Sequence, residues 1–275
     1  MCPCWNCQVV PTARDSGFLW VMLETTWRNI AVFGISGAGY DMSTSIFSPE
    51  GRIFAAEYAK KAVEQGATSI GILCNEGVVL LAEKIMKPLQ ESDSVEKISK
   101  IDEHLGIATS GLMADARKLI ENARIKAQSY WLTFEEPVPG EAVAEYICDI
   151  KAQFTQTGGA RPYGVAMMIG SIDHDASPKL FVTDPVGTYW GFLAAVIGRG
   201  SNRAGEYLET HYKPKMKITQ AINLALDTLR QTTDAELTSR NVEIAKIPVS
   251  TGIFYKLSSE EVDSHLSPME SEKKA

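Results

Sequence analysis

The segment from Tyr40 to Ala59 reads YDMSTSIFSPEGRIFAAEYA and indicates how the chain around it folds. Ser48 is a favoured N-cap residue, Pro49 suits the first helical position, and Glu50 complements the positive end of the helix dipole. Apolar residues then recur at three- and four-residue spacing, at Ile53, Phe54, Tyr58, Ala62 and Val63. We therefore predict an amphipathic helix that begins at Ser48-Pro49 and ends at Gly66, which would supply a left-handed stop.

Beyond Gly66 the hydrophobic pattern changes from helical to strand-like. Runs bounded by turn residues predict strands at 68–74, 78–84, 97–102, 105–109, 164–172, 179–183, 188–197, 242–248 and 253–257. Helical spacing predicts helices at about 112–131, 140–156, 202–211 and 218–232. Ser258 and Glu261 match a capping box, which predicts the start of a short last helix.

The order of these elements indicates the fold class. Groups of strands joined by hairpin-length turns alternate with pairs of helices, unlike the strict strand-helix alternation of a parallel sheet. The simplest assembly stacks two antiparallel sheets face to face, with a helix layer outside each. We therefore predict an α+β fold, a four-layer αββα sandwich with an extra N-terminal helix.

The opening segment resembles the N-terminal signature of proteasome alpha subunits, in which Tyr-Asp-Arg precedes Phe-Ser-Pro-x-Gly-Arg and Gln-Val-Glu-Tyr-Ala. Met42 replaces the arginine of that signature, and Ala55 and Ala56 replace Gln-Val. Matching motifs extend the resemblance over residues 40–266, at 66–72, 94–98, 109–116, 161–165 and 183–187. The resemblance implies the fold of the N-terminal nucleophile hydrolases, with the leading helix that alpha subunits add.

Among the seven alpha types, three stretches resemble type five most, namely 83–84, 101–106 and 130–134. The insertion that type five often carries before Arg-Pro-Phe-Gly is missing before Arg161.

Length and composition predict one large domain with tails. The chain has 275 residues, of which 45% are hydrophobic and 22% charged, enough to bury a sizeable core. We expect residues 1–39 to be an N-terminal extension, disordered or misannotated, and 40–266 to be the alpha-subunit domain. Residues 267–275 would form a C-terminal tail.

Charge and cysteine usage exclude several classes of protein. The net charge of −7 argues against a nucleic-acid surface, which needs clustered lysine and arginine. Five cysteines in a chain of this size do not imply a disulfide scaffold. The apolar run at 18–23 is too short for a membrane span or a typical signal core. The expected location is the cytoplasm, to which the family adds the nucleus.

Catalysis in this fold requires a nucleophile at the mature N-terminus, because its own α-amine acts as the base. Here the predicted helix runs directly into the first strand, so Thr68 is internal and Ala67 matches the nucleophile position better. An active hydrolase processed at Thr68 is the alternative hypothesis, and a free-standing binding module is another. Cys2 would expose a thiol after removal of Met1, but it lies far before the first strand.

Metal and phosphate sites are not predicted. The Cys2, Cys4 and Cys7 run lacks a fourth nearby ligand for a closed zinc site. The glycine-rich stretch at 198–205 follows a strand but lacks the dinucleotide-binding spacing, which favours a tight turn. His174 between two aspartates is interpreted as a polar turn. We expect no cofactor.

The resemblance implies a noncatalytic subunit that works in assembly, gating and docking. Its expected partners are other alpha subunits in a seven-membered ring, beta-ring subunits, C-terminal tails of regulatory ATPases or other activators, and unfolded polypeptides in transit. Tyr40, Asp41, Pro49 and Tyr58 match the cluster that holds the gate open, with helix entry and core packing as their alternative role.

Lys97 matches two lysines of the family, the catalytic one of active beta subunits and the one that lines the docking pocket of alpha rings. In an alpha ring the implied role is to pair with the carboxylate of an activator tail, and Gly66 and Leu112 match neighbouring pocket positions. The alternative is a solvated lysine on a strand.

Overall fold

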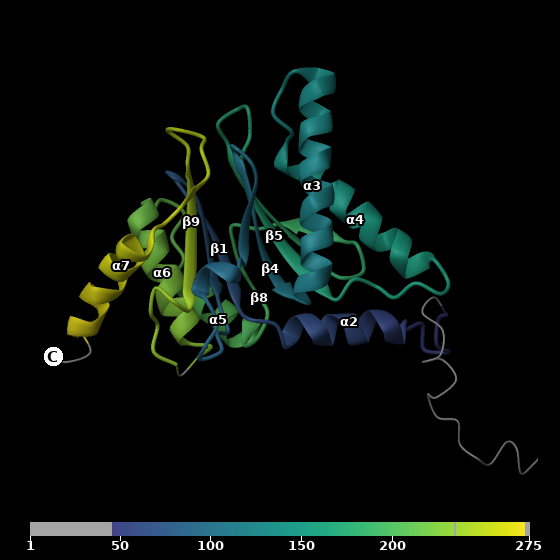
Figure 1. The fold of residues 1–275 in the computed structure, drawn as a ribbon, viewed down its shortest axis with the longest axis horizontal. Helices are drawn as coiled ribbons and strands as arrows, with labels where there is room; N and C mark the ends of the chain where they lie inside the picture. The colour runs from purple at the N-terminus through teal and green to yellow at the C-terminus, as the bar shows by residue number, and fades with distance from the viewer. Residues whose placement is uncertain (1–45, 234, 273–275) are drawn as a thin grey trace, which may run out of the picture. The chain divides into compact units, whose positions relative to one another are not determined.

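The structure is a computed structural model that describes residues 46–233 and 235–272, with the backbone alone at residue 93 and residues 267–272. Its strands are β1 (Ser69–Cys74), β2 (Gly77–Glu83), β3 (Ile98–Asp102), β4 (Leu105–Gly111), β5 (Val165–Ile172), β6 (Pro178–Thr183), β7 (Tyr189–Gly191), β8 (Ala194–Ile197), β9 (Val242–Pro248) and β10 (Tyr255–Lys256). They form two antiparallel sheets (Figure 1), with the orders β10-β9-β2-β1-β8 and β3-β4-β5-β6-β7.

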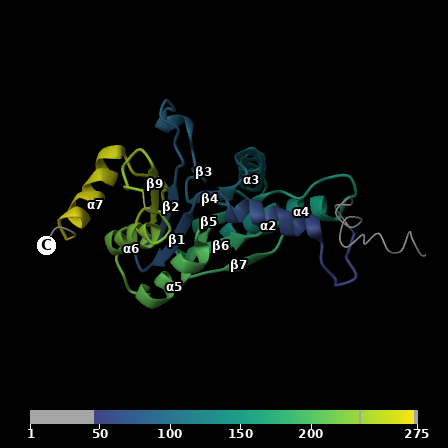
Figure 2. The ribbon, with the colours of Figure 1, turned by 90° about the horizontal axis from the view of Figure 1, so that it is seen from below.

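The helices form layers outside the two sheets. They are α2 (Phe54–Glu64), α3 (Met113–Phe134), α4 (Gly140–Gln156), α5 (Ser201–His211), α6 (Ile218–Arg230) and α7 (Ser259–Glu272). Figures 1 and 2 show α3 and α4 beside the second sheet, and α5 and α6 beside the first. None of the helices described is long and apolar enough to cross a membrane.

Three buried clusters hold the layers together, one between the sheets and one under each pair of helices. Strand β2 shows how a single strand serves two of them, because successive side chains of a strand point to opposite faces. Val79 and Leu81 pack with α6, whereas Val78 and Leu80 pack against the second sheet. Both faces of β2 are buried, and the four-layer αββα sandwich is confirmed.

One predicted strand is divided in two. The stretch 188–197 forms β7 at the edge of the second sheet and β8 at the edge of the first. Phe192 N–H still donates to Leu180 O of β6 at 2.8 Å, whereas Leu193 O accepts from Leu73 N–H of β1 at 2.8 Å. The chain therefore changes sheets between these two residues, which local hydrophobicity does not reveal.

The predicted start of the first helix was wrong. Helix α2 begins at Phe54, and Ser48 to Arg52 form a tight turn instead. Ser48 N–H donates to Arg52 O at 2.8 Å, and Gly51, at φ +76°, donates to Ser48 O at 2.8 Å. Pro49 lies at the second position of this turn, where its fixed φ is equally favourable. The residues that favour a helix start also favour a turn.

Gly66 also has a different role from the predicted one. It follows α2 without a positive φ, so it is not a left-handed stop. A Cβ built there would lie 2.3 Å from the backbone nitrogen of Gly111 and 2.5 Å from Ser110 Oγ. The position needs glycine because two backbone segments meet there, where α2 passes into β1.

Other predicted boundaries agree closely with the structure. Helix α4 spans 140–156 as predicted, and the expected hairpin joins β1 to β2. The capping box before α7 is present, since Ser258 N–H donates to Glu261 Oε2 at 2.8 Å and Glu261 N–H to Ser258 Oγ at 3.3 Å. The predicted last strand is reduced to the two residues of β10.

Candidate functional site

The corner between β4 and α3 brings together the three residues predicted for a docking pocket. Gly66 packs against Gly111, the last residue of β4, and Leu112 follows directly as the residue before α3. Leu112 N–H donates to Gly164 O at 2.9 Å. Lys97 reaches the same corner, because its Nζ donates to Met113 Sδ at 3.5 Å.

Lys97 is buried, which contradicts the alternative of a solvated lysine. Its residue is 5% exposed, and it lies just before β3 rather than within it. Burial lowers the pKa of Lys97, and the carboxylates of Glu243 and Glu83 oppose that shift. Within the described residues, the acceptor for its ammonium is a thioether sulfur, a weak one. Among the described residues, the ammonium therefore has no strong hydrogen-bond acceptor.

Glu243 of β9 fixes the backbone at Lys97. Its Oε2 accepts from Lys97 N–H at 2.8 Å and from Ile98 N–H at 2.9 Å, and its Oε1 pairs with Lys256. The carboxylate is 4% exposed, so its charge is satisfied inside the protein. Sequence reasoning missed Glu243, because the residues it binds lie 145 and 146 positions earlier in the chain.

Thr68, the candidate nucleophile of the alternative hypothesis, is completely buried. Its Oγ1 donates to Arg199 O at 2.8 Å and lies 3.4 Å from Thr232 Oγ1. Its nitrogen is an amide N–H that donates to Glu83 Oε2 at 3.4 Å, and Glu83 Oε1 pairs with Arg199 at 2.9 Å. In this chain the residue therefore offers neither a free amine nor an exposed hydroxyl.

The signature residues before and within α2 form a local network. Arg52 N–H donates to Ser48 Oγ at 3.1 Å, and the Arg52 guanidinium binds both carboxylate oxygens of Glu57 at 2.5 and 2.6 Å. Pro49 is exposed on the turn, and Tyr58 is exposed on α2. The gate residues Tyr40 and Asp41 lie outside the described residues, as does Met42, which replaces the arginine of the signature.

A second network ties the start of α3 to the second sheet. Arg161 binds Asp115 through two hydrogen bonds of 2.6 and 2.7 Å, and Asp115 Oδ2 also accepts from Gly164 N–H at 2.9 Å. Burial alone would raise the pKa of Asp115, but the bonds from Arg161 and Gly164 outweigh it and lower the pKa. This network holds Leu112 next to Gly164 at the predicted docking corner.

The weaker motifs occupy turns. The glycine-rich stretch forms the tight connection from β8 to α5, with Gly198 at φ +98° and Gly200 at φ +72°. His174 lies in the turn between β5 and β6. No group of three or more His, Cys, Asp or Glu in the part of the chain that the structure describes is arranged to hold a metal ion. Cys2, Cys4 and Cys7 lie outside that part.

Comparison with known proteins places these features in a family. The model for the proteasome subunit family matches residues 63–247, and the model for the N-terminal signature of proteasome A subunits matches residues 40–62. The proteasome subunit alpha of Methanobrevibacter smithii is 46% identical over 239 residues, covering 86% of this chain and 95% of that protein.

Two further relatives have the same name. The proteasome subunit alpha of Archaeoglobus fulgidus is 44% identical and covers 83% of this chain and 92% of its own length. That of Pyrococcus horikoshii is 44% identical, with 83% and 87% covered. With the two-sheet sandwich, the helix before β1 and the matched signature, the chain belongs to the proteasome family, among its alpha subunits.

Proposed function

We propose that this alpha subunit is a noncatalytic component of the alpha ring of the 20S core particle, where it supports ring assembly, control of substrate entry and docking of activators during protein degradation. The observation that carries this proposal is the packing of α2 against β4 and β5 directly before β1, with Ala56, Ala59 and Val63 buried. Helix α2 lies directly before the position at which the mature chain of an N-terminal nucleophile hydrolase would have to begin.

The surroundings of Thr68 support the same conclusion. A nucleophile of this class needs a free α-amine to take its proton, and Thr68 would gain one only if cleavage after Ala67 removed α2. Its hydroxyl proton is directed to the carbonyl of Arg199, inside the protein. The residue therefore works as a buried link between β1 and the turn before α5.

The proposed gate consists of Tyr40, Asp41, Pro49 and Tyr58. Its support is the signature match at residues 40–62, together with the hydrogen-bonded turn from Ser48 to Arg52. This turn limits the directions from which the preceding residues can enter α2. A stiff turn next to the gate residues would restrict the backbone conformations available to the N-terminal tail that precedes it.

The proposed docking pocket consists of Lys97, Gly66 and Leu112. Its support is the convergence of the three residues on the corner between β4 and α3, with Leu112 45% exposed. The carboxylate of an activator tail would give the Lys97 ammonium the strong acceptor that Met113 sulfur does not provide.

We also propose a finer assignment, as alpha type five of a seven-membered hetero-oligomeric ring in the cytoplasm and nucleus. It rests on the type-five resemblance at 83–84, 101–106 and 130–134. The proposed partners are other alpha subunits, beta-ring subunits, C-terminal tails of regulatory ATPases or other activators, and unfolded polypeptides on a ubiquitin-dependent route.

Assembly tests the proposed function directly. The full chain, tagged at its C-terminus and expressed in its native host, is expected to purify with core particles and to be absent from the monomer fraction. A Thr68→Ala variant should leave the peptidase activity of those particles unchanged. Recovery of the chain from its native host only as a monomer, or loss of peptidase activity with Thr68→Ala in assembled particles, would refute the proposal.

A further inference from the structure

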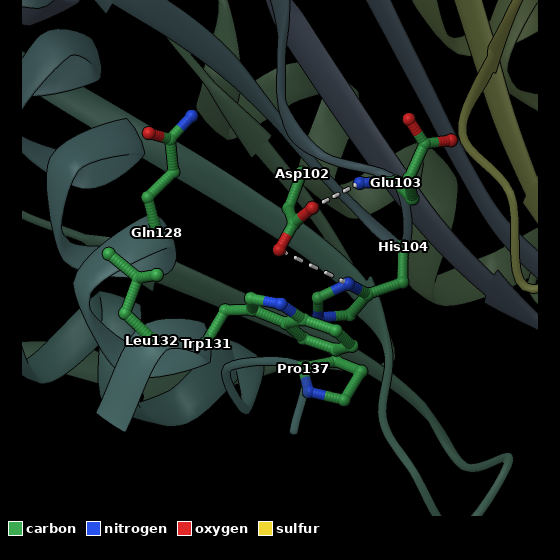
Figure 3. Close-up of a pocket in the computed structure, with 7 residues that line it drawn as sticks. All are labelled: Asp102, Glu103, His104, Gln128, Trp131, Leu132 and Pro137. Atoms are coloured by element: carbon green, nitrogen blue, oxygen red, sulfur yellow. Dashed lines mark hydrogen bonds and ion pairs between the residues drawn. The ribbon is translucent and has the colours of Figure 1, made fainter. Parts of the chain in front are cut away.

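A cavity of about 440 Å³ lies away from the docking corner, between the β3–β4 turn and the C-terminal half of α3. Asp102 lines it from the end of β3, His104 from the turn, Trp131 and Leu132 from the helix, and Pro137 from the segment after α3. Figure 3 shows the Asp102 carboxylate directed toward the His104 ring and the Trp131 indole, while the Glu103 carboxylate points away.

The apolar part of this cavity is exposed to water. Trp131 is 51% exposed and Leu132 82%, although the earlier part of α3 buries its apolar face from Ala116 to Ala127. Figure 1 shows this end of α3 standing beyond the strands. An exposed tryptophan beside an exposed leucine, around a concave site, is the pattern of an anchor position at a protein interface.

The polar part of the cavity is acidic. Asp102 Oδ1 accepts from Glu103 N–H at 2.7 Å, and Oδ2 lies 3.9 Å from His104 Nδ1. Within the described residues, Asp102 forms no ion pair with lysine or arginine. The neighbouring Lys100 already binds Glu103, at 2.5 Å. Glu135 and Glu136, both exposed, precede Pro137 and add negative charge to the segment after α3.

His104 does not neutralise the Asp102 carboxylate through a close contact. Its Nε2 lies 2.8 Å from Val138 O, which makes that nitrogen the donor and fixes the ring against the segment after α3. The Nδ1 atom faces Asp102 at 3.9 Å, too far for a hydrogen bond. The His104 ring is therefore held in one orientation, and the Asp102 carboxylate, with its side chain 31% exposed, is available to a ligand.

We propose that this pocket receives an arginine side chain from a neighbouring subunit of the core particle. A guanidinium is planar, stacks on an indole face and binds a carboxylate with paired N–H groups, whereas its methylene stem covers apolar surface. Trp131 offers the face, Asp102 the carboxylate and Leu132 the apolar contact. The inference rests on the proposed function, because it needs the chain to assemble with other subunits.

A competition experiment tests the pocket. Untagged wild-type chain and one tagged variant are expressed together at equal levels, core particles are purified, and the ratio of the two chains is measured by mass spectrometry. Asp102→Asn and Trp131→Ala should each lower the variant's share about threefold to tenfold, whereas Trp131→Phe should lower it less. Asp149→Asn, which removes the same charge from the exposed face of α4, is the matched control and should compete equally.

A crosslinking measurement keeps the inference falsifiable if a variant folds poorly. A photoreactive benzoylphenylalanine at Leu132 should crosslink to a segment of another subunit that contains arginine. Equal competition by Asp102→Asn and Trp131→Ala, or a crosslink only to segments without arginine, would overturn the inference while leaving the proposed function intact. Absence of the wild-type chain from core particles would instead overturn the proposed function.

Discussion

At the scale of single residues, long-range contacts decide what each charged side chain does. Lys97 has the sequence context of an accessible strand lysine, yet it is buried, with its backbone N–H bound to Glu243 and its ammonium against Met113. The signature residues behave differently, because the partners of Ser48 and Arg52 lie within five positions. Local patterns therefore predict local networks well, and contacts across the chain poorly.

The docking role of Lys97 makes a prediction at this scale. Lys97→Ala should leave assembly intact and weaken activator-stimulated peptide hydrolysis, because a charge-assisted bond of about 1.5 to 3 kcal/mol corresponds to a tenfold to hundredfold loss in tail affinity. Lys100→Ala is the control, since the side chain of that lysine is 42% exposed and paired with Glu103. Unchanged tail affinity in Lys97→Ala particles, measured by titration with an activator, would count against the docking role.

Lys151 of α4 makes a second prediction, on stability and pH. Its ammonium is fully buried and donates to Val165 O at 3.0 Å, Thr183 Oγ1 at 2.8 Å and Asp184 O at 3.2 Å. Burial lowers the pKa of Lys151 from its ordinary value of 10.5 to about 8, although Cys148 and Asp184 oppose the shift. The unfolded chain therefore holds more protons between these two pH values, and stability attributable to Lys151 rises with pH in that window.

Denaturant unfolding of the purified chain across this pH range checks that expectation. Relative to Lys151→Met, the wild-type chain should gain on the order of 1 to 3 kcal/mol in free energy of unfolding between pH 8 and 10.5. Comparison with the variant removes the contribution of the titrating groups that both chains share. Parallel stability curves for the two chains would show that Lys151 does not titrate as proposed.

At the scale of elements, existence and type were predicted better than boundaries. The antiparallel pairs, the helix pairs and the capping box before α7 follow from hydrophobic period and local hydrogen bonding. The start of α2 did not follow, because Ser48, Pro49 and Gly51 satisfy a turn as well as a helix cap. The division of 188–197 did not follow either, since it depends on which sheet each residue joins.

The passage from α2 into β1 provides a prediction at the element scale. Gly66→Ala should destabilise the chain by about 1 to 3 kcal/mol, because the new Cβ would clash with the backbone of Gly111. Gly205→Ala in α5 is the matched control: a Cβ there meets nothing within 4 Å and should be neutral or slightly stabilising. Thermal unfolding of both variants measures the difference, and equal stabilities would contradict the close approach at Gly66.

At the scale of the whole molecule, the proposed noncatalytic role of the αββα sandwich depends on helix α2, which precedes the first strand. The sandwich and the family signature follow from the sequence, whereas the burial of Thr68 and the convergence of Gly66, Lys97 and Leu112 needed the three-dimensional contacts. Helix α2 lies at the ends of the sheets, where Figure 1 shows it crossing below β4 and β5. The proposed noncatalytic role therefore depends on α2, before β1, as much as on the sandwich.

The N-terminus of the chain recovered from core particles tests the noncatalytic role most directly. Intact-mass and N-terminal peptide measurements on the purified particle should find a subunit that begins before Tyr40 and retains α2 joined to β1. A mature chain that begins at Thr68 would have lost α2 and gained a free α-amine. That result would contradict the noncatalytic role.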